Sequence, residues 1–350
     1  MNKFLSEILE QPKAIENIIR FYSIEGGMNL LDKIRKNIEQ KPVEQIIFTG
    51  MGSSFFLSHA ASCLFNQLNM YSTCINTSEL LHYNLSVLNK STLLVCSSQS
   101  GESFEIKKVL ERLPETVFCV GIVNEGNNTL ARKADVALLC KGGNEEMTST
   151  KTYVVTSLAA YILGCYLSGH WNDEKIKLLN MLNDNFRIML SNYKGWLSDV
   201  LNFLGDISTI QIIARGPSFS TASQSALMFK EANHIPATGI LGGEFRHGPM
   251  EMVKPGFKSI LFASEGRTLG QSIRMAEDIA EFGGKVWLIT NKKTKIKNNN
   301  ILQTHINQSN EFLFSVESIV PVQLFVDAYA KTHGFEAGSF SRGAKVTVIE

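Results

Sequence analysis

An internal repeat constrains the fold of this chain more than any other feature. Residues 46–55 resemble residues 210–219, and Gly52 then pairs with Gly216, 164 positions later. A second match, Ile122-Val123-Asn124 with Ile289-Thr290-Asn291, lies at an offset of 167. Two nearly constant offsets in the same order predict two copies of one structural unit.

The segments within each copy alternate between apolar runs and amphipathic stretches. In the first copy we expect strands at 45–48, 92–96, 117–123 and 136–139, with helices running to Phe65 and Leu113. In the second copy, 210–214 and 259–264 correspond to the first two strands. Strand, turn and helix in alternation predict an α/β fold: two tandem domains, each a mostly parallel sheet flanked by helices in three α/β/α layers.

The domain boundaries follow from this reading. We expect an N-terminal helical segment at 1–42, a first domain at 43–172, a helical linker at 173–203, a second domain at 204–337 and a C-terminal tail at 338–350. A chain of 350 residues can bury enough apolar surface to fold without disulfides or a structural metal.

Charge and cysteine usage narrow the class of protein. The formal net charge is +1, so no global field favours nucleic acid or an anionic membrane. The six cysteines are widely spaced, which favours buried thiols in a reducing compartment. The start of the chain has no signal-peptide pattern, and the most membrane-like stretch, 158–167, is too short to span a bilayer. We expect a cytoplasmic protein with no nucleic-acid or membrane partner, no metal and no cofactor.

A serine cluster in the first copy is the best candidate for a ligand site. Ser98, Gln99, Ser100 and Ser103 follow a buried strand and open a helix, where hydroxyls, backbone N–H groups and the helix dipole favour an anion. The neighbouring turn contributes Gly52, Ser53 and Ser54. The alternative is that these serines only cap helices. The second copy has Glu265 in this region, and a carboxylate repels phosphate, so we expect one phosphate site per chain.

Several motifs resemble those of the sugar isomerase (SIS) domains, and in particular the isomerase half of glucosamine-6-phosphate synthase. The residues that carry this resemblance are Ser98-Gln99-Ser100-Gly101-Glu102-Ser103, Glu7-Ile8-Leu9-Glu10-Gln11-Pro12, Met51-Gly52-Ser53-Ser54, Ser149-Thr150-Lys151, Lys230-Glu231, Glu244-Phe245-Arg246-His247-Gly248-Pro249 and Ala344-Lys345. They extend over nearly the whole chain.

The resemblance implies roles for individual residues. Lys345, beside Ala344, is the candidate for a Schiff base with the sugar carbonyl, Glu231 for proton transfer, and His247 for ring opening. Ser149 is a candidate for binding the sugar hydroxyls. The resemblance also implies a homodimer in which the His247 loop reaches the partner's site. From the residues alone, each of these has an alternative reading. Lys345 can be a surface lysine, and Glu231 can form a surface charge pair with Lys230. His247 can be an ordinary loop histidine, and Ser149 can be a helix N-cap.

The resemblance implies one of two related functions. The chain is expected to be a phosphosugar aldose/ketose isomerase, or an isomerase or deaminase that acts on amino-sugar phosphates. The substrates would be of the glucosamine 6-phosphate and fructose 6-phosphate type. Asn2 follows Met1 where the synthase carries a cysteine nucleophile and its glutaminase domain, so we expect no dependence on glutamine by this chain itself. Residues 142–147 and 338–343 depart from the family's pattern, which leaves the sugar and the direction of flux open. The alternatives are a fructosamine-6-phosphate deglycase and a non-catalytic phosphosugar-binding protein.

Overall fold

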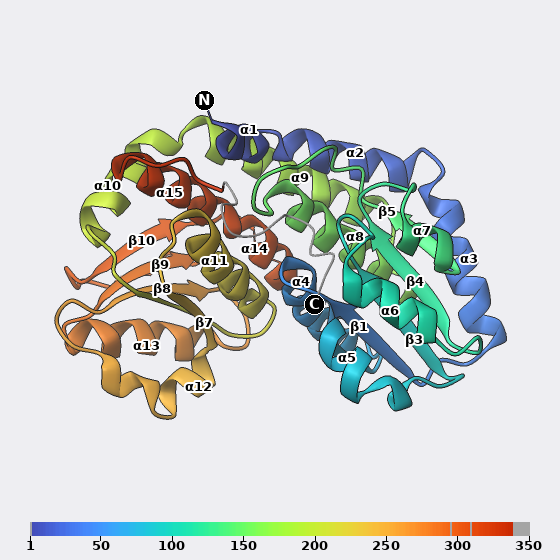
Figure 1. The fold of residues 1–350 in the computed structure, drawn as a ribbon. Helices are drawn as coiled ribbons and strands as arrows, with labels where there is room; N and C mark the ends of the chain where they lie inside the picture. The colour runs from blue at the N-terminus through green and yellow to red at the C-terminus, as the bar shows by residue number, and fades with distance from the viewer. Residues whose placement is uncertain (1, 295, 309, 339–350) are drawn as a thin grey trace. The chain divides into compact units, whose positions relative to one another are not determined.

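The computed structural model describes residues 2–294, 296–308 and 310–338. The described chain divides into two compact units. The first unit comprises residues 10–183, and the second comprises residues 2–9 together with 184–338. A five-stranded sheet with helices on both faces forms the centre of each (Figure 1).

The first unit contains two N-terminal helices, five strands with their connecting helices, and the start of a long helix that ends in the second unit. These elements are α2 (Gln11–Ser23), α3 (Gly27–Gln40), β1 (Gln45–Gly50), α4 (Ser53–Gln67), β2 (Ser72–Asn76), α5 (Thr77–Tyr83), η1 (Leu85–Val87), β3 (Thr92–Ser97), α6 (Phe104–Arg112), β4 (Phe118–Val123), α7 (Thr129–Lys133), β5 (Val136–Leu139), α8 (Lys151–Leu167) and α9 (Asp173–Ser191).

The second unit has the same plan with additional helices at its two ends. Its elements are α1 (Lys3–Leu9), α10 (Tyr193–Leu204), β6 (Ile210–Ala214), α11 (Ser218–Ala232), β7 (Ala237–Leu241), α12 (Gly242–Arg246), η2 (Pro249–Met252), β8 (Lys258–Ala263), α13 (Leu269–Glu281), β9 (Lys285–Thr290), β10 (Ile301–His305), α14 (Glu311–Glu317) and α15 (Ile319–Thr332). Helix α1 joins this unit through Asn2, whose Nδ2 donates to Asp327 Oδ1 at 2.7 Å.

The strand orders confirm the predicted fold class and the repeat. The first sheet has the order β2-β1-β3-β4-β5, and the second, read from its other edge, has the equivalent order β7-β6-β8-β9-β10, with every pairing parallel. Gly52 and Gly216, the paired glycines, adopt φ of 51° and 56°. This left-handed region favours glycine, so both copies need one at the same turn.

The sequence predicted four strands in the first copy, and the structure adds a fifth, β2. Only its first residue, Ser72, is buried, and the other four are half-buried. The segment Ser-Thr-Cys-Ile-Asn is neither a continuous apolar run nor a clean alternation, and its pairing with β1 decides its conformation.

Helix α8 accounts for the apolar stretch at 158–167. All but one of its 17 residues are buried, as expected for a helix that is apolar all round. A different stretch of the described chain, Glu311–Thr332, is long and apolar enough to cross a membrane, with a mean hydropathy of 1.3. Since 94% of that window is buried, and core helices pass the same test, this is weak evidence for a membrane segment. All six cysteines are described and free, and four are buried.

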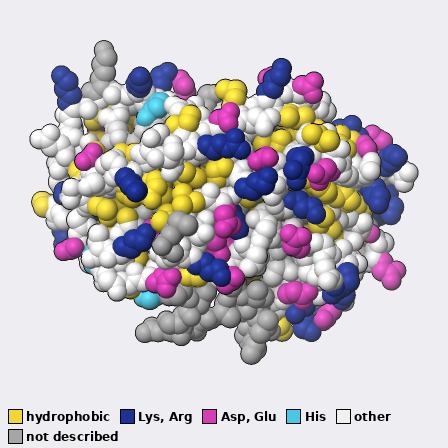
Figure 2. All heavy atoms as spheres, turned by 90° about the horizontal axis from the view of Figure 1, so that it is seen from above, with side chains coloured by type: hydrophobic (Ala, Val, Ile, Leu, Met, Phe, Trp, Pro, Cys, Tyr) yellow, Lys and Arg dark blue, Asp and Glu magenta, His cyan; other side chains and the backbone are white. Residues whose placement is uncertain are grey.

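The two faces of the second sheet carry different helices. Helices α11, α14 and α15 pack together on one face, whereas α12 and α13 cover the other (Figure 1). Trp287 and Phe325 meet in the core with ring centroids 5.5 Å apart. On the molecular face in Figure 2, Lys and Arg side chains are interspersed with Asp and Glu side chains, in line with the net charge of +1.

Candidate active site

Two loops of the first unit meet where the direction of strand order reverses. Strand β1 lies between β2 and β3, and Thr49 of β1 is in register with Cys96 of β3. Neighbouring strands lie about 4.8 Å apart, so the segments that follow β1 and β3 leave the sheet side by side. Open parallel sheets bind ligands at this point. The structure thereby brings the turn 51–54 together with residues 98–103, hereafter the serine loop.

The hydroxyls of the serine loop are oriented by the loop's own backbone. Ser98 Oγ accepts a hydrogen bond from Gly101 N at 3.1 Å, and Ser100 Oγ accepts one from Glu102 N at 3.2 Å. Because each oxygen acts as an acceptor there, each O–H remains available to donate to a ligand oxygen. Ser103 precedes α6 as its N-cap, yet its side chain makes no capping hydrogen bond among the described residues. Helix capping alone therefore does not explain this cluster.

The serine loop is braced by the loop that follows β4. Gly101 has φ of 66°, and a Cβ at this position would lie 1.9 Å from Asn128 Oδ1. Glu102 Oε1 accepts a hydrogen bond from Thr129 N at 2.6 Å, and this bond is the main reason that the pKa of Glu102 is lowered. Only glycine fits beside Asn128, and the carboxylate of Glu102 serves the start of α7. These contacts hold the serine loop in one conformation.

The corresponding end of the second sheet has a different chemistry. Glu265, in the region equivalent to the serine loop, pairs with Lys292 at 2.6 Å. The carboxylate of Glu311 lies 3.4 Å from where a Cβ on Gly266 would be, and burial raises the pKa of Glu311. Two carboxylates at this end disfavour a phosphate, and the single phosphate site in the first copy stays a prediction.

Ser149 lies at the start of α8, where a carboxylate takes over the capping role. Thr150 is the N-cap of α8 but its side chain makes no capping bond among the described residues. Glu145 instead accepts hydrogen bonds from Thr150 N at 2.9 Å and Thr152 N at 3.1 Å, and Ser149 Oγ lies 2.9 Å from Thr152 Oγ1. Thr150 therefore occupies the N-cap position, while the carboxylate of Glu145 supplies the capping hydrogen bonds.

Two of the family-like motifs contact each other inside the first unit. Lys151 of the Ser-Thr-Lys motif is 3% exposed, and its ammonium pairs with the carboxylate of Glu10 from the Glu-Gln-Pro motif. This ion pair joins the approach to α2 with the first turn of α8. It is a structural contact, and it holds the start of α8 against the start of α2.

Glu231 and His247 both belong to the second unit, on opposite faces of its sheet. Glu231, half-buried, lies in the last turn of α11. His247 follows α12, which lies on the other face with α13 (Figure 1). The expected loop at 242–249 is in fact helix α12, the exposed residues His247 and Gly248, and the start of η2. Lys345 and Ala344 lie outside the described residues.

Two asparagines that the sequence reasoning did not assign to the site organise it. Asn124 N–H donates to Gln99 O at 3.3 Å, and its side chain accepts from Gly142 N and donates to Gly143 O. Asn128 fills the space beside Gly101. The internal repeat could have indicated Asn124, because Asn124 aligns with Asn291. The side chain of Asn291 also closes a turn, since its Oδ1 accepts a hydrogen bond from Glu265 N.

Within the part of the chain that the structure describes, no group of three or more His, Cys, Asp or Glu side chains is placed to hold a metal ion. The serine loop presents hydroxyls, backbone N–H groups and the N-terminus of α6, and its one carboxylate, that of Glu102, bonds Thr129. This arrangement can hold a phosphate without a metal or a lysine.

Comparison with known proteins gives a consistent result. The family model described as "SIS domain" matches residues 41–164 and 203–330. The glutamine–fructose-6-phosphate aminotransferase [isomerizing] of Wigglesworthia glossinidia brevipalpis is 28% identical over 331 residues, which cover 91% of this chain and 54% of that protein. The chain thus spans about half the length of this curated relative.

Solved structures share the fold over nearly the full chain. The C-terminal domain of glucosamine-fructose-6-phosphate aminotransferase from Francisella tularensis has a TM-score of 0.86 at 22% identity, covering 97% of this chain and 98% of that one. Glucosamine-6-phosphate deaminase from Thermotoga maritima has a TM-score of 0.76 at 19% identity, covering 99% and 100%.

Proposed function

The chain belongs to the SIS domain family, and from that premise we propose that it is an enzyme that isomerises or deaminates a phosphorylated hexose or amino-hexose. Glucosamine 6-phosphate and fructose 6-phosphate are the leading pair. The names of the relatives support this choice, since they include an aminotransferase [isomerizing] and a glucosamine-6-phosphate deaminase.

The serine loop is the observation that carries the proposal. Its hydroxyls, its backbone and the N-terminus of α6 converge at the switch point of a parallel sheet, and the second copy has carboxylates instead. We assign the phosphate to Ser54, Ser98, Gln99, Ser100 and Ser103, with Gly52 and Ser53 shaping the adjacent turn. We assign the sugar hydroxyls to Ser149.

The proposed chemistry begins with ring opening by His247, which moves a proton between the ring oxygen and the anomeric hydroxyl. For an amino-hexose phosphate, Glu231 takes the proton from C2 of the open-chain aldose and returns it to C1, which gives the C2 imine of the ketose. The amine of Lys345, next to Ala344, displaces ammonia from that imine, and water then hydrolyses the lysine imine, which releases the ketose phosphate and restores the free amine. For a hexose phosphate, the protonated amine of Lys345 polarises the carbonyl, and Glu231 moves the same proton through an enediol while a hydroxyl proton passes between the two oxygens.

A homodimer is part of the proposal, because of where Glu231 and His247 lie. The sheet of the second unit separates the helix that carries Glu231 from the helix that precedes His247. Two side chains on opposite faces of one sheet do not converge on one sugar. A partner subunit that supplies its His247 to a site containing Glu231 removes this difficulty.

The test is a panel of hexose, amino-hexose and fructosamine 6-phosphates with product analysis, combined with borohydride trapping. The proposal predicts turnover of a hexose or amino-hexose 6-phosphate, reductive attachment of the sugar to Lys345, and loss of isomerisation in Lys345→Met with phosphate affinity retained. Lys13→Met, at an exposed lysine, is the control. A deglycase already carries an amine on its substrate. Activity of Lys345→Met on a fructosamine 6-phosphate, without trapping, would replace the isomerase proposal with that one.

A further inference from the structure

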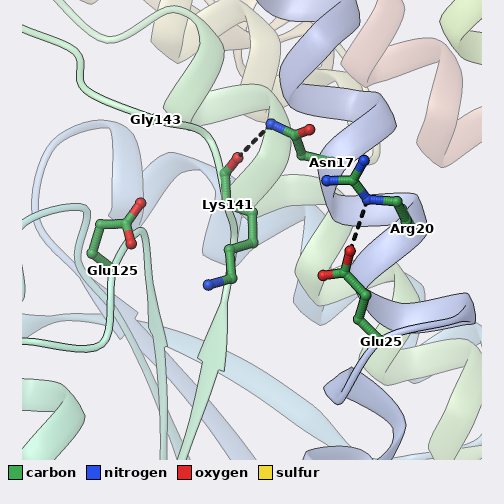
Figure 3. A pocket seen from close by; sticks show the side chains of 6 residues that line it. All are labelled: Asn17, Arg20, Glu25, Glu125, Lys141 and Gly143. Carbon is green, nitrogen blue, oxygen red and sulfur yellow. Dashed lines mark hydrogen bonds and ion pairs between the residues drawn. The ribbon is translucent and has the colours of Figure 1, made fainter.

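The first unit has a cavity whose lining residues lie outside the serine loop. It has a volume of about 380 Å³ and is lined by Asn17, Arg20, Glu25, Glu125, Lys141 and Gly143 (Figure 3). Glu125 follows β4, and Lys141 and Gly143 follow β5. The other three come from α2 and the residues after it. We call these six residues the charged pocket. None of them belongs to the phosphate site.

The charged pocket presents both signs of charge. Arg20 Nε pairs with Glu25 Oε1 at 2.8 Å, which leaves the two terminal nitrogens of Arg20 for a ligand. Glu125 and Lys141 form no ion pair with each other or with any other described residue, and the Lys141 ammonium lies 5.1 Å from the ring centroid of Phe21. In Figure 3, Glu125 lies on one side, Arg20 and Glu25 lie on the other, and Lys141 lies between them.

The backbone at Lys141 is held in an unfavourable conformation. Its φ is 57°, a left-handed value that costs a non-glycine residue about 1–2 kcal/mol. Asn124 imposes it: Lys141 N donates to Asn124 O at 3.3 Å, Gly142 N donates to Asn124 Oδ1 at 2.9 Å, and Asn124 Nδ2 donates to Gly143 O at 2.7 Å. Conformations of this kind, held in place by their surroundings, cluster at ligand sites.

We propose that the charged pocket binds the head group of an α-amino acid. Arg20 and Lys141 hold the ligand's carboxylate, and Glu125 holds its ammonium group. A simple anion such as phosphate would face Glu25 and Glu125, and a simple cation would face Arg20 and Lys141. A ligand that carries both charges can pair with the acidic and the basic side chains at once. The volume of the cavity lies within the range of small-molecule sites.

The amino acid can come from two sources. It is either free, or attached through its nitrogen to the sugar phosphate. Asn124 links the two sites, because it shapes the Lys141–Gly143 turn and also donates to Gln99 O in the serine loop. The attached form rests on the phosphate site of the proposed function, whereas the free form does not.

The free form is tested by calorimetric titration of the full chain with the twenty standard amino acids. The best binder is then compared with the amine lacking its carboxylate and the acid lacking its ammonium, and each loss should weaken binding at least tenfold. Glu125→Gln and Arg20→Gln should do the same. Neither side chain is buried, so the fold is retained. Lys13→Gln, an exposed change on the same helix, is the control.

The attached form is tested with the fructosamine 6-phosphates of glycine and of methylamine, which differ only in the carboxylate. The glycine compound should bind at least tenfold more tightly, and Arg20→Gln should abolish the difference while leaving the methylamine compound unaffected. Binding of the methylamine compound reports on the phosphate site alone, so failure of the proposed function is seen separately. Discrimination in either test supports the charged pocket. If no amino acid binds and the two sugar phosphates bind equally, the proposal is overturned.

Discussion

At the residue scale, the proposed phosphate site depends on Ser98 and Ser100. Each hydroxyl oxygen accepts a backbone N–H of the serine loop, and its proton is left for a ligand. Replacing both by alanine removes two hydrogen bonds to a charged oxygen, each contributing about 1.5–3 kcal/mol. We expect the affinity for a sugar 6-phosphate to fall at least tenfold per site by calorimetric titration. Ser264→Ala, in the second copy, is the matched control, and an unchanged affinity in the double variant would contradict the phosphate assignment.

The buried carboxyl group of Glu317 makes the stability of the fold depend on pH. It is 1% exposed, and burial raises its pKa from 4.5 to about 7, while a hydrogen bond from Asn185 partly opposes the shift. The folded state therefore keeps a proton that the unfolded state has released above pH 4.5. Stability from this group is complete below that pH and is lost as the pH rises through about 7, by about 3 kcal/mol.

Glu317→Gln removes this dependence. We expect the free energy of unfolding, measured with urea between pH 5 and pH 8, to fall less with pH in the variant than in the parent protein. The exposed substitution Glu16→Gln is the control. An identical pH slope in the parent and in Glu317→Gln would show that Glu317 keeps an ordinary pKa.

At the scale of elements, the start of α8 depends on two acids from elsewhere in the chain. Glu145 accepts the first-turn N–H groups, and Glu10 neutralises the buried Lys151. Glu10→Gln leaves an ammonium group that is only 4% exposed without its counter-charge. Because the Glu10 side chain is 52% exposed and water screens the pair, we expect a loss of about 1–3 kcal/mol by urea unfolding.

A double-mutant cycle separates this pair from general effects. Lys151→Met combined with Glu10→Gln should cost less than the sum of the two single changes, since the buried charge is then gone. The exposed pair Lys13–Glu16 is the comparison, and breaking it should change stability by no more than about 1 kcal/mol. Additive costs at Glu10 and Lys151 would mean that the ion pair contributes nothing to holding α8.

At the scale of the whole molecule, the proposed dimer makes a distinctive prediction. If each site combines Glu231 of one subunit with His247 of another, then Glu231→Gln and His247→Ala should each be inactive alone. When equal amounts of the two variants are mixed, unfolded and refolded together, half of the dimers are hybrids. Each hybrid has one intact site out of two. Activity should therefore return to about a quarter of the parent level. Each variant refolded alone is the control, and no recovery in the mixture would place both residues in one subunit's site or in none.

The sequence alone determined those features that depend on neighbours along the chain. The repeat, the apolar strands, the turns that carry the paired glycines Gly52 and Gly216, and the serine loop were all predicted from it, because burial and turn geometry act over a few residues. Tertiary structure decided the features that join distant segments. The edge strand β2 forms only by pairing with β1, and Glu10 meets Lys151 across 141 positions.

The same division explains the candidate site. Local pattern was enough to make Ser98 and Ser100 candidates, whereas Asn124, the charged pocket and the separation of Glu231 from His247 by a sheet depend on which strands are neighbours. Residue types and their period along the chain predict what a segment does with its own backbone. They do not specify which other segment it packs against, because that choice is made by burial and hydrogen bonding summed over the whole unit.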